Sequence, residues 1–154
     1  MTATTSGLDP LDRIEKSIDI DAPASTVFAL VSRPGWWINN GEVDAEADLR
    51  RDGDVWVVTH PEHGEFRFET IESTPPSYVA HRWHHRLPDD GVDRATLVEF
   101  RIEDRPGGGV RLSVVESGFS LLHKPREQWL ADRADNDRGW DTELAAARDF
   151  VTAP

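Results

Sequence analysis

The sequence of 154 residues contains no cysteine and no long apolar run. The absence of thiols excludes disulfide bonds, thiolate nucleophiles and metals ligated by cysteine. A membrane-crossing helix needs about 18 or more consecutive apolar residues, and no segment approaches that length. The first residues, MTATTSGLDPLD, have neither a basic start nor an apolar core, as a secretory signal would. We therefore expect a cytoplasmic protein in which residues 1–12 form a disordered tail.

Positive charge is scarce. The chain has 17 Lys and Arg residues against 29 Asp and Glu residues, which gives a net charge of −12. Such a field repels phosphate backbones, so we predict no nucleic-acid partner. A chain of this length forms most simply one domain that buries roughly two-thirds of its unfolded surface. We place that single domain at residues 13–152 and predict no membrane association.

The histidines raise the question of a metal site. His60 and His63 lie in a predicted turn, whereas His81, His84 and His85 lie in a predicted strand. Neither group has the HExxH spacing of a zinc site, and strand alternation turns His84 away from His81. We predict no bound metal, and no motif indicates a cofactor.

Alternating patterns predict seven strands and two kinds of helix. Ile14, Ile18 and Ile20 alternate with polar residues over 13–20, which is typical of a half-buried strand. A short amphipathic helix is predicted over 24–32. Further strands are predicted over 43–50, 54–60, 65–73, 78–86, 96–103 and 110–116, and Ile71 breaks the alternation, which indicates a bulge or a change of facing. From 125 onward, residues spaced by three or four positions form a single face and predict a helix, in which Gly139 indicates a break or a close approach. The residues of this face are Trp129, Arg133, Asn136, Trp140, Leu144, Ala147 and Val151.

Several short motifs occur in a characteristic order. A strand ending in Ala22-Pro23 leads to a Val27-Phe28 helix and then to a tryptophan pair, and later segments read Pro-Pro to Trp at 75–83, Glu-Ser-Gly-Phe at 116–119 and Gly-Trp at 139–140. In this order the chain resembles the START-like (SRPBCC) superfamily, and within it the homologues of the activator of the heat-shock chaperone ATPase. The resemblance covers residues 13–152.

The resemblance implies an α+β helix-grip fold. In it, a curved seven-stranded antiparallel sheet surrounds a long C-terminal helix, and two short helices follow the first strand. Relatives bind lipids, hormones or polyketides, or act as aromatases, cyclases or chaperone activators, so the fold alone does not choose the function. The segment 123–135 is more polar than a helix that closes a cavity would require, and whether it closes one is left open.

Large aromatic side chains are predicted to converge on the concave face of the sheet. Each alone is explained most simply by core packing, but together they favour a ligand cavity. The predicted cavity residues are Phe66, Phe68, Trp83, Phe100, Trp129 and Trp140, with Trp36 and Trp37 at the rim, together with three polar residues on the same face, Lys16, His81 and Glu116.

The three polar residues allow alternatives. Lys16 is the one charge on an apolar strand face, and a buried ammonium requires a partner. Because the resemblance makes the first and last strands neighbours, we predict that Lys16 pairs with Glu116. The alternative is that both side chains are exposed to solvent at the open end of the sheet. His81 is either a satisfied core histidine or a group that binds or deprotonates a ligand.

These observations predict a protein that binds a small apolar or aromatic molecule between the sheet and the C-terminal helix. One alternative is a cyclase or hydrolase of polyketide type, with His81 and Glu116 as acid and base. Another is a co-chaperone-like module that binds a protein partner through its surface. The identity of the ligand and the oligomeric state do not follow from the sequence.

Overall fold

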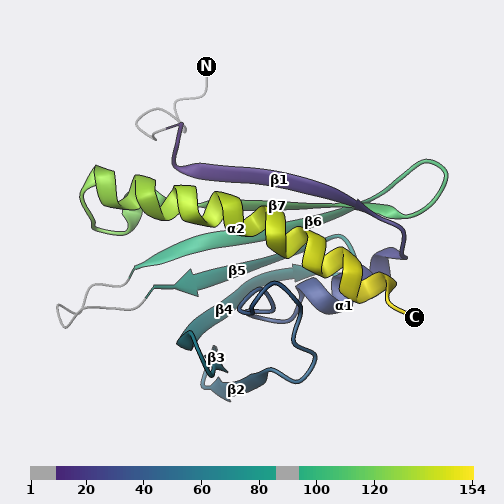
Figure 1. The fold of residues 1–154 in the computed structure, drawn as a ribbon, viewed down its shortest axis with the longest axis horizontal. Coiled ribbons are helices and arrows are strands. Elements are labelled where there is room, and N and C mark those ends of the chain that lie inside the picture. Colours follow the sequence, from purple (N-terminus) through teal and green to yellow (C-terminus); the bar gives the residue numbers. More distant parts are fainter. Residues whose placement is uncertain (1–9, 86–93) are drawn as a thin grey trace.

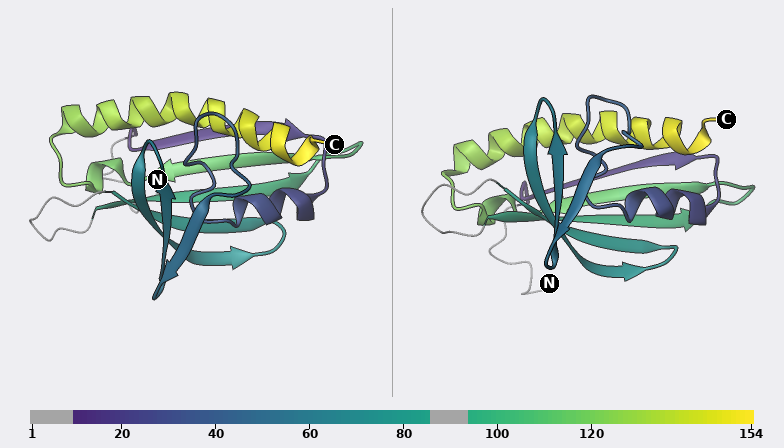
Figure 2. Two further views of the ribbon diagram at one scale, coloured as in Figure 1. Left: turned by 60° about the horizontal axis from the view of Figure 1, so that its bottom comes forward. Right: turned by 90° about the horizontal axis from the view of Figure 1, so that it is seen from below.

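The structure, a computed structural model, describes residues 10–85 and 94–154. The elements are β1 (Arg13–Ile20), α1 (Ala24–Val31), β2 (Asp48–Asp52), β3 (Val55–His60), β4 (Gly64–Thr74), β5 (Tyr78–His84), β6 (Ala95–Asp104), β7 (Val110–Ser117), the 3₁₀ helix η2 (Phe119–Leu121) and α2 (Arg126–Thr152). The strands form one antiparallel sheet in the order β1-β7-β6-β5-β4-β3-β2. Helix α2 lies along one face of the curved sheet (Figures 1 and 2). The predicted seven-stranded sheet and long C-terminal helix are confirmed.

One short helix follows β1 in the described residues, not the two that the resemblance implied. Helix α1 ends at Val31, and the chain then makes turns in which Gly35 has a φ of 70°. Only glycine adopts that left-handed conformation without strain. The turn replaces the second helix and directs Trp36 and Trp37 toward the core, where both are buried.

The predicted strand over 43–50 is shorter than expected. Regular pairing begins only at Asp48 in β2. The side chain of Asp44 accepts a hydrogen bond from the backbone N–H of Glu46, which closes a local turn instead of a ladder. Ala45 was predicted to lie on the buried face of this strand, but its side chain is exposed. Burial of apolar surface therefore does not favour a strand at this position.

Two other predictions concern irregular positions. The pairing of β4 with β5 shifts register between Thr70 and Glu72, which confirms the bulge at Ile71. Of the predicted N-terminal tail, residues 1–9 lie outside the described residues. Asp12 belongs to the folded domain, because its carboxylate accepts hydrogen bonds from the backbone N–H groups of Gly118 and Ser120. The sequence also predicts a polar loop at 87–93, and this segment lies outside the described residues.

Helix α2 runs without a break through Gly139. A Cβ added at Gly139 meets no atom within 4 Å, so neither the predicted break nor the predicted close approach is present. The helix is held by its packed face, on which Trp129, Trp140 and Leu144 are buried. Tertiary packing of this stripe outweighs the low helix propensity of one glycine.

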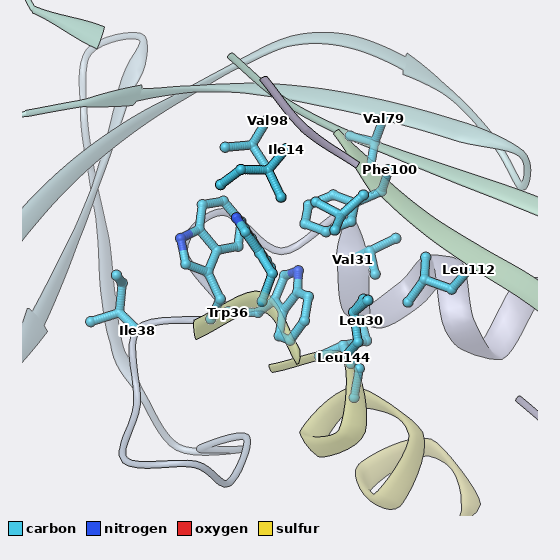
Figure 3. Packing of buried hydrophobic residues seen from close by; sticks show 14 of the residues in the cluster. Ile14, Leu30, Val31, Trp36, Ile38, Val79, Val98, Phe100, Leu112 and Leu144 are labelled. Carbon is cyan, nitrogen blue, oxygen red and sulfur yellow. The ribbon is translucent and has the colours of Figure 1, made fainter. Parts of the chain in front are cut away.

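The core lies between the concave face of the sheet and the helices. Figure 3 shows Trp36 among the buried residues of this core, which include Val98 and Phe100 of β6 and Leu144 of α2, and its ring centroid lies 5.6 Å from that of Phe100. All four side chains are buried. The turn after α1 therefore supplies a large side chain to the middle of the core, between the sheet and α2.

We predict that Gly35→Ala destabilises the protein strongly. A Cβ there would lie 2.6 Å from the Phe68 ring and 2.7 Å from Val58, in addition to the strain of the positive φ. Strain of about 1–2 kcal/mol and overpacking of about 1–3 kcal/mol predict a total loss of roughly 2–5 kcal/mol. Urea unfolding measures it. The matched control is Gly53→Ala, which has a φ of 64° with no atom within 4 Å; equal losses in the two variants would contradict the packing argument.

Candidate ligand site

Trp37 occupies the centre of the concave face. Its ring centroid lies 5.1 to 5.9 Å from six other rings, those of Trp36, Phe68, His81, Trp83, Phe100 and Trp140. The sequence placed Trp36 and Trp37 at the rim of a cavity, and this was wrong, because the Gly35 turn carries them inward. They fill the space that Phe68, Phe100 and Trp140 were predicted to enclose.

Trp129 is buried at the start of α2, with the guanidinium of Arg126 5.7 Å from its ring centroid. Its ring is not among those in contact with Trp37. The sequence placed it correctly on the buried stripe of the helix, and it belongs to the same hydrophobic cluster as Phe68, Phe100 and Trp140.

An open pocket lies where β4 begins and β5 ends, and we call it the corner pocket. Its volume is about 460 Å³, and it is lined by Val55, His63, Glu65, Phe66, Arg67, Trp83, His84 and His85. Two of the predicted cavity residues, Phe66 and Trp83, are therefore in the pocket, and both are only partly buried. The Trp83 ring makes an edge contact with Trp37 at 5.7 Å, so the pocket adjoins the aromatic core.

His85 is a pocket residue that the sequence interpretation missed. Its ring stacks on that of Trp83 with the centroids 5.4 Å apart and the planes at 29°. Its Nε2 lies 3.4 Å from the hydroxyl of Thr96. Burial lowers the pKa of His85 to about 4, so the ring is neutral at neutral pH. The signal was present in the sequence, because the alternation that turns His81 and Trp83 inward also turns His85 inward.

Glu116 is fully buried and has three donors around it. Thr96 Oγ1 lies 2.7 Å from Oε2, Trp140 Nε1 lies 2.9 Å from Oε1, and Asn136 Nδ2 lies 3.1 and 3.2 Å from the two oxygens. Burial raises the pKa of Glu116, and the three hydrogen bonds oppose that shift. A buried carboxyl whose pKa is raised by burial is a candidate for a functional proton-binding group.

Lys16 does not pair with Glu116, so this prediction was wrong. Its Nζ lies 2.9 Å from Asp137 and 3.2 Å from Asp141, one turn apart on α2. These two carboxylates raise the pKa of Lys16, the hydrogen bond to Asp137 most strongly. In the β1–β7 register, Lys16 lies opposite Val114, whereas Ile14 lies opposite Glu116. Strand alternation placed Lys16 on the side of α2, but the helix supplied acidic partners at closer range.

His81 is a satisfied core histidine. Its Nε2 donates to the carbonyl oxygen of Val31 at 2.9 Å, so the carbonyl requires the proton on that nitrogen. Its Nδ1 then accepts from the hydroxyl of Thr70 at 3.0 Å. Burial lowers the pKa of His81. Both ring nitrogens are used within the protein, which weakens the acid–base interpretation of this residue.

A curved antiparallel sheet wrapped around one long helix, with a pocket at its open end, defines the helix-grip class of proteins. The family described as "Activator of Hsp90 ATPase homolog 1-like protein" matches residues 21–146, and the chain belongs to this family. No curated protein matches the chain. No helix among the described residues is long and apolar enough to cross a membrane, and in the same residues no three His, Asp or Glu side chains gather so as to hold a metal ion.

Solved structures of other proteins share the fold at low sequence identity. Protein MLL2253 of Mesorhizobium loti is 16% identical with a TM-score of 0.65, and the match covers 90% of this chain and 96% of that one. The Aha1 dimer of Colwellia psychrerythraea is 15% identical with a TM-score of 0.63, covering 92% and 96%. Protein BH1534 of Bacillus halodurans is 20% identical with a TM-score of 0.62, covering 90% and 96%.

A carboxyl on α2 holds the turn that carries the tryptophans. Asn39 Nδ2 donates to Glu143 Oε1 at 2.8 Å and also lies 3.2 Å from the carbonyl oxygen of Trp36. Burial raises the pKa of Glu143 to about 7, against the opposing effect of the Asn39 hydrogen bond. The folded protein therefore binds this proton more tightly than the unfolded chain does.

We predict that the titration of Glu143 lowers the free energy of unfolding as pH rises. Its carboxyl is protonated more in the folded state between its ordinary pKa of 4.5 and about 7, so the free energy of unfolding falls as pH rises through this window. Glu143→Gln keeps the acceptor for Asn39 and removes the titration. After allowance for solvent screening, the wild-type loss attributable to Glu143 is roughly 1–2 kcal/mol. Urea unfolding at several pH values measures it, with the exposed Glu62→Gln as control; parallel profiles for wild type and Glu143→Gln would refute it.

Proposed function

We propose that the protein binds a small aromatic or apolar molecule in the corner pocket. The observation that carries this proposal is the pair of partly buried rings, Phe66 and Trp83, facing a space of about 460 Å³. Small-molecule sites have volumes of roughly 300–1,000 Å³ and are lined by aromatic side chains with a few polar groups. His63 and His85 supply polar groups of that kind. Membership of a family whose fold is associated with apolar ligands agrees with the proposal.

The site lies at the open end of the concave face rather than in its interior, because Trp36 and Trp37 occupy the interior. The Nε1 atoms of both residues are buried and have no hydrogen-bond partner. An unpaired buried donor costs about 1–3 kcal/mol. Neither residue lines the corner pocket, so these two donors belong to the packed interior and not to the proposed site.

The polyketide cyclase or hydrolase alternative is weaker as first stated. Both ring nitrogens of the proposed base, His81, are hydrogen-bonded within the protein, one to Val31 and the other to Thr70. Its proposed acid, Glu116, remains buried and surrounded by donors. An acid–base step in this protein that uses an imidazole would therefore need one other than His81.

We predict that Trp83→Ala weakens the binding of 2-methylnaphthalene by about tenfold or more, because the ring supplies stacking and apolar contact at the pocket. The measurement is a titration of the ¹⁵N-labelled protein followed by the indole N–H signals in NMR spectra. Trp56→Ala is the matched control, because Trp56 is a partly buried indole on β3 that does not line the pocket. Equal affinities for wild type and Trp83→Ala, or no binding to either, would refute the corner pocket as the site.

A second candidate function is the binding of a protein partner through the outer face of the sheet. Ile71 is 45% exposed and Leu121 is 62% exposed, and both line a groove of about 730 Å³ that also includes Leu97. Exposed apolar surface of this kind marks interaction sites. The name of the family suggests an Hsp90 chaperone as the partner to test. A rise in the ATPase rate of Hsp90 with wild type, lost with Leu121→Asp, would support this function, and no effect of wild type would exclude it.

A further inference from the structure

Three residues connect the buried carboxyl to the corner pocket. Glu116 Oε2 lies 2.7 Å from Thr96 Oγ1, and Thr96 Oγ1 lies 3.4 Å from His85 Nε2. Glu116 and Thr96 are buried, whereas His85 is partly buried and lines the pocket. The three side chains come from β7, from β6 and from the residue after β5, which are adjacent in the sheet. We call them the Glu116–Thr96–His85 relay.

The chemistry of the donors decides where a proton on Glu116 can sit. Oε1 accepts from the indole N–H of Trp140 and from the amide of Asn136, and both of these groups can only donate. Oε2 also lies 3.2 Å from the Asn136 amide, but it is the oxygen that faces the hydroxyl of Thr96, which can donate or accept. A proton on Glu116 therefore belongs on Oε2, where its hydrogen bond points to Thr96. The link between Glu116 and Thr96 is the only one of the four contacts that can reverse.

The hydroxyl of Thr96 has one proton, so its two hydrogen bonds are coupled. With Glu116 ionised, Thr96 donates to Glu116 and accepts from His85, which places the ring proton on Nε2 and leaves Nδ1 as an acceptor. With Glu116 protonated, Thr96 accepts from Glu116 and donates to Nε2, which places the ring proton on Nδ1. The protonation state of Glu116 thus selects the tautomer of His85.

We propose that the Glu116–Thr96–His85 relay makes the corner pocket a site for aromatic molecules with a hydroxyl group, which donates its hydrogen bond to Nδ1 of His85 while Glu116 is ionised. This inference rests on the proposed function and adds the chemical class of the ligand. The relay also gives the hydroxyl proton a path. The proton passes to Nδ1, the Nε2 proton passes to Thr96, and the Thr96 proton passes to Glu116 Oε2, so the ligand becomes its conjugate base and Glu116 becomes neutral.

Burial, more than the surrounding charges, lowers the pKa of His85 and keeps its ring neutral. Lys124 opposes its protonation, Asp132 favours it, and His84 opposes it, while burial has the largest effect on its pKa. Lys124 and Asp132 are themselves paired at 2.7 Å, which reduces their separate effects. Near Glu116, the ammonium of Lys16 is held by Asp137 and Asp141. The relay is therefore set by hydrogen bonds rather than by a neighbouring ion.

The first test needs no ligand and reads the tautomer of His85 in mildly alkaline buffer. Long-range ¹H–¹⁵N NMR spectra distinguish the protonated ring nitrogen from the unprotonated one. In wild type we expect the proton on Nε2. In Glu116→Gln the side-chain amide donates to Thr96 as a protonated carboxyl would, so the proton should move to Nδ1. An unchanged His85 tautomer in Glu116→Gln would overturn the relay, whatever the pocket binds.

The second test compares 2-naphthol with 2-methylnaphthalene as probes. Thr96→Val keeps the shape of the side chain and removes the hydroxyl, so we expect 2-naphthol to bind about tenfold more weakly while 2-methylnaphthalene changes by less than about twofold. Thr96→Ser restores the hydroxyl and should recover the affinity for 2-naphthol. Thr70→Val is the matched control, because Thr70 also bonds an imidazole through its hydroxyl, but that imidazole is His81.

The outcomes separate this inference from the proposed function. Equal losses for both probes in Thr96→Val, or the same loss in Thr70→Val, would overturn the role of the relay while leaving the pocket in place. Binding of neither probe to wild type would overturn both the proposed function and the ligand class. A selective loss of 2-naphthol affinity, restored by Thr96→Ser, would support the assignment of His85 as the group that contacts the ligand and of Thr96 as a positioning residue.

Discussion

The contact of Trp37 with rings from every side of the concave face holds the structure together. Its neighbours come from β4, β5, β6 and α2, so one side chain joins four elements that are distant in the sequence. The contact exists because Gly35 lets the chain turn inward after α1. Edge and tilted arrangements between aromatic rings add to the free energy gained by burial. The interior is consequently packed, and the corner pocket lies toward the end of β5.

Polar groups under α2 follow a consistent arrangement. Glu116 is reached by a hydroxyl, an amide and an indole N–H rather than by a cation. Lys16 lies further along the same face of the sheet and is neutralised by two carboxylates of the helix. Burying an ion pair beside the aromatic cluster would cost desolvation of two charges. Neutral donors around one carboxyl avoid half of that cost and leave a proton that can move.

Much of the fold follows from local patterns in the sequence. The alternation of Ile14, Ile18 and Ile20 identifies β1, and the spacing of Trp129, Trp140 and Leu144 identifies the buried face of α2. The resemblance to a known family supplied the topology. The segment 32–47 was predicted poorly, because its path depends on the left-handed Gly35 and on an Asp44 turn, and neither has a periodic signature.

The candidate site was predicted in its chemistry more than in its position. Period-two alternation correctly turned His81, Trp83 and Glu116 toward the helix. It could not show which of two inward polar groups would pair, because that depends on how α2 lies over the sheet. The sequence therefore predicted the wrong partner, Glu116, for Lys16, which pairs with Asp137 and Asp141. The sequence also did not predict that the interior is filled and that the pocket lies at the corner, because this depends on where one turn places Trp37.

The packing of six rings around Trp37 also has an optical consequence. Indoles held at fixed angles within 6 Å of one another, as Trp36 and Trp37 are at 88° and 5.9 Å, couple their electronic transitions. The protein therefore possesses an intrinsic chiral chromophore in the near ultraviolet, whose circular dichroism depends on tertiary packing rather than on helix content. Expansion of the core that leaves the sheet intact would abolish the near-ultraviolet signal before the far-ultraviolet signal of the backbone changes. The near-ultraviolet signal therefore measures the packing of the core without an attached dye.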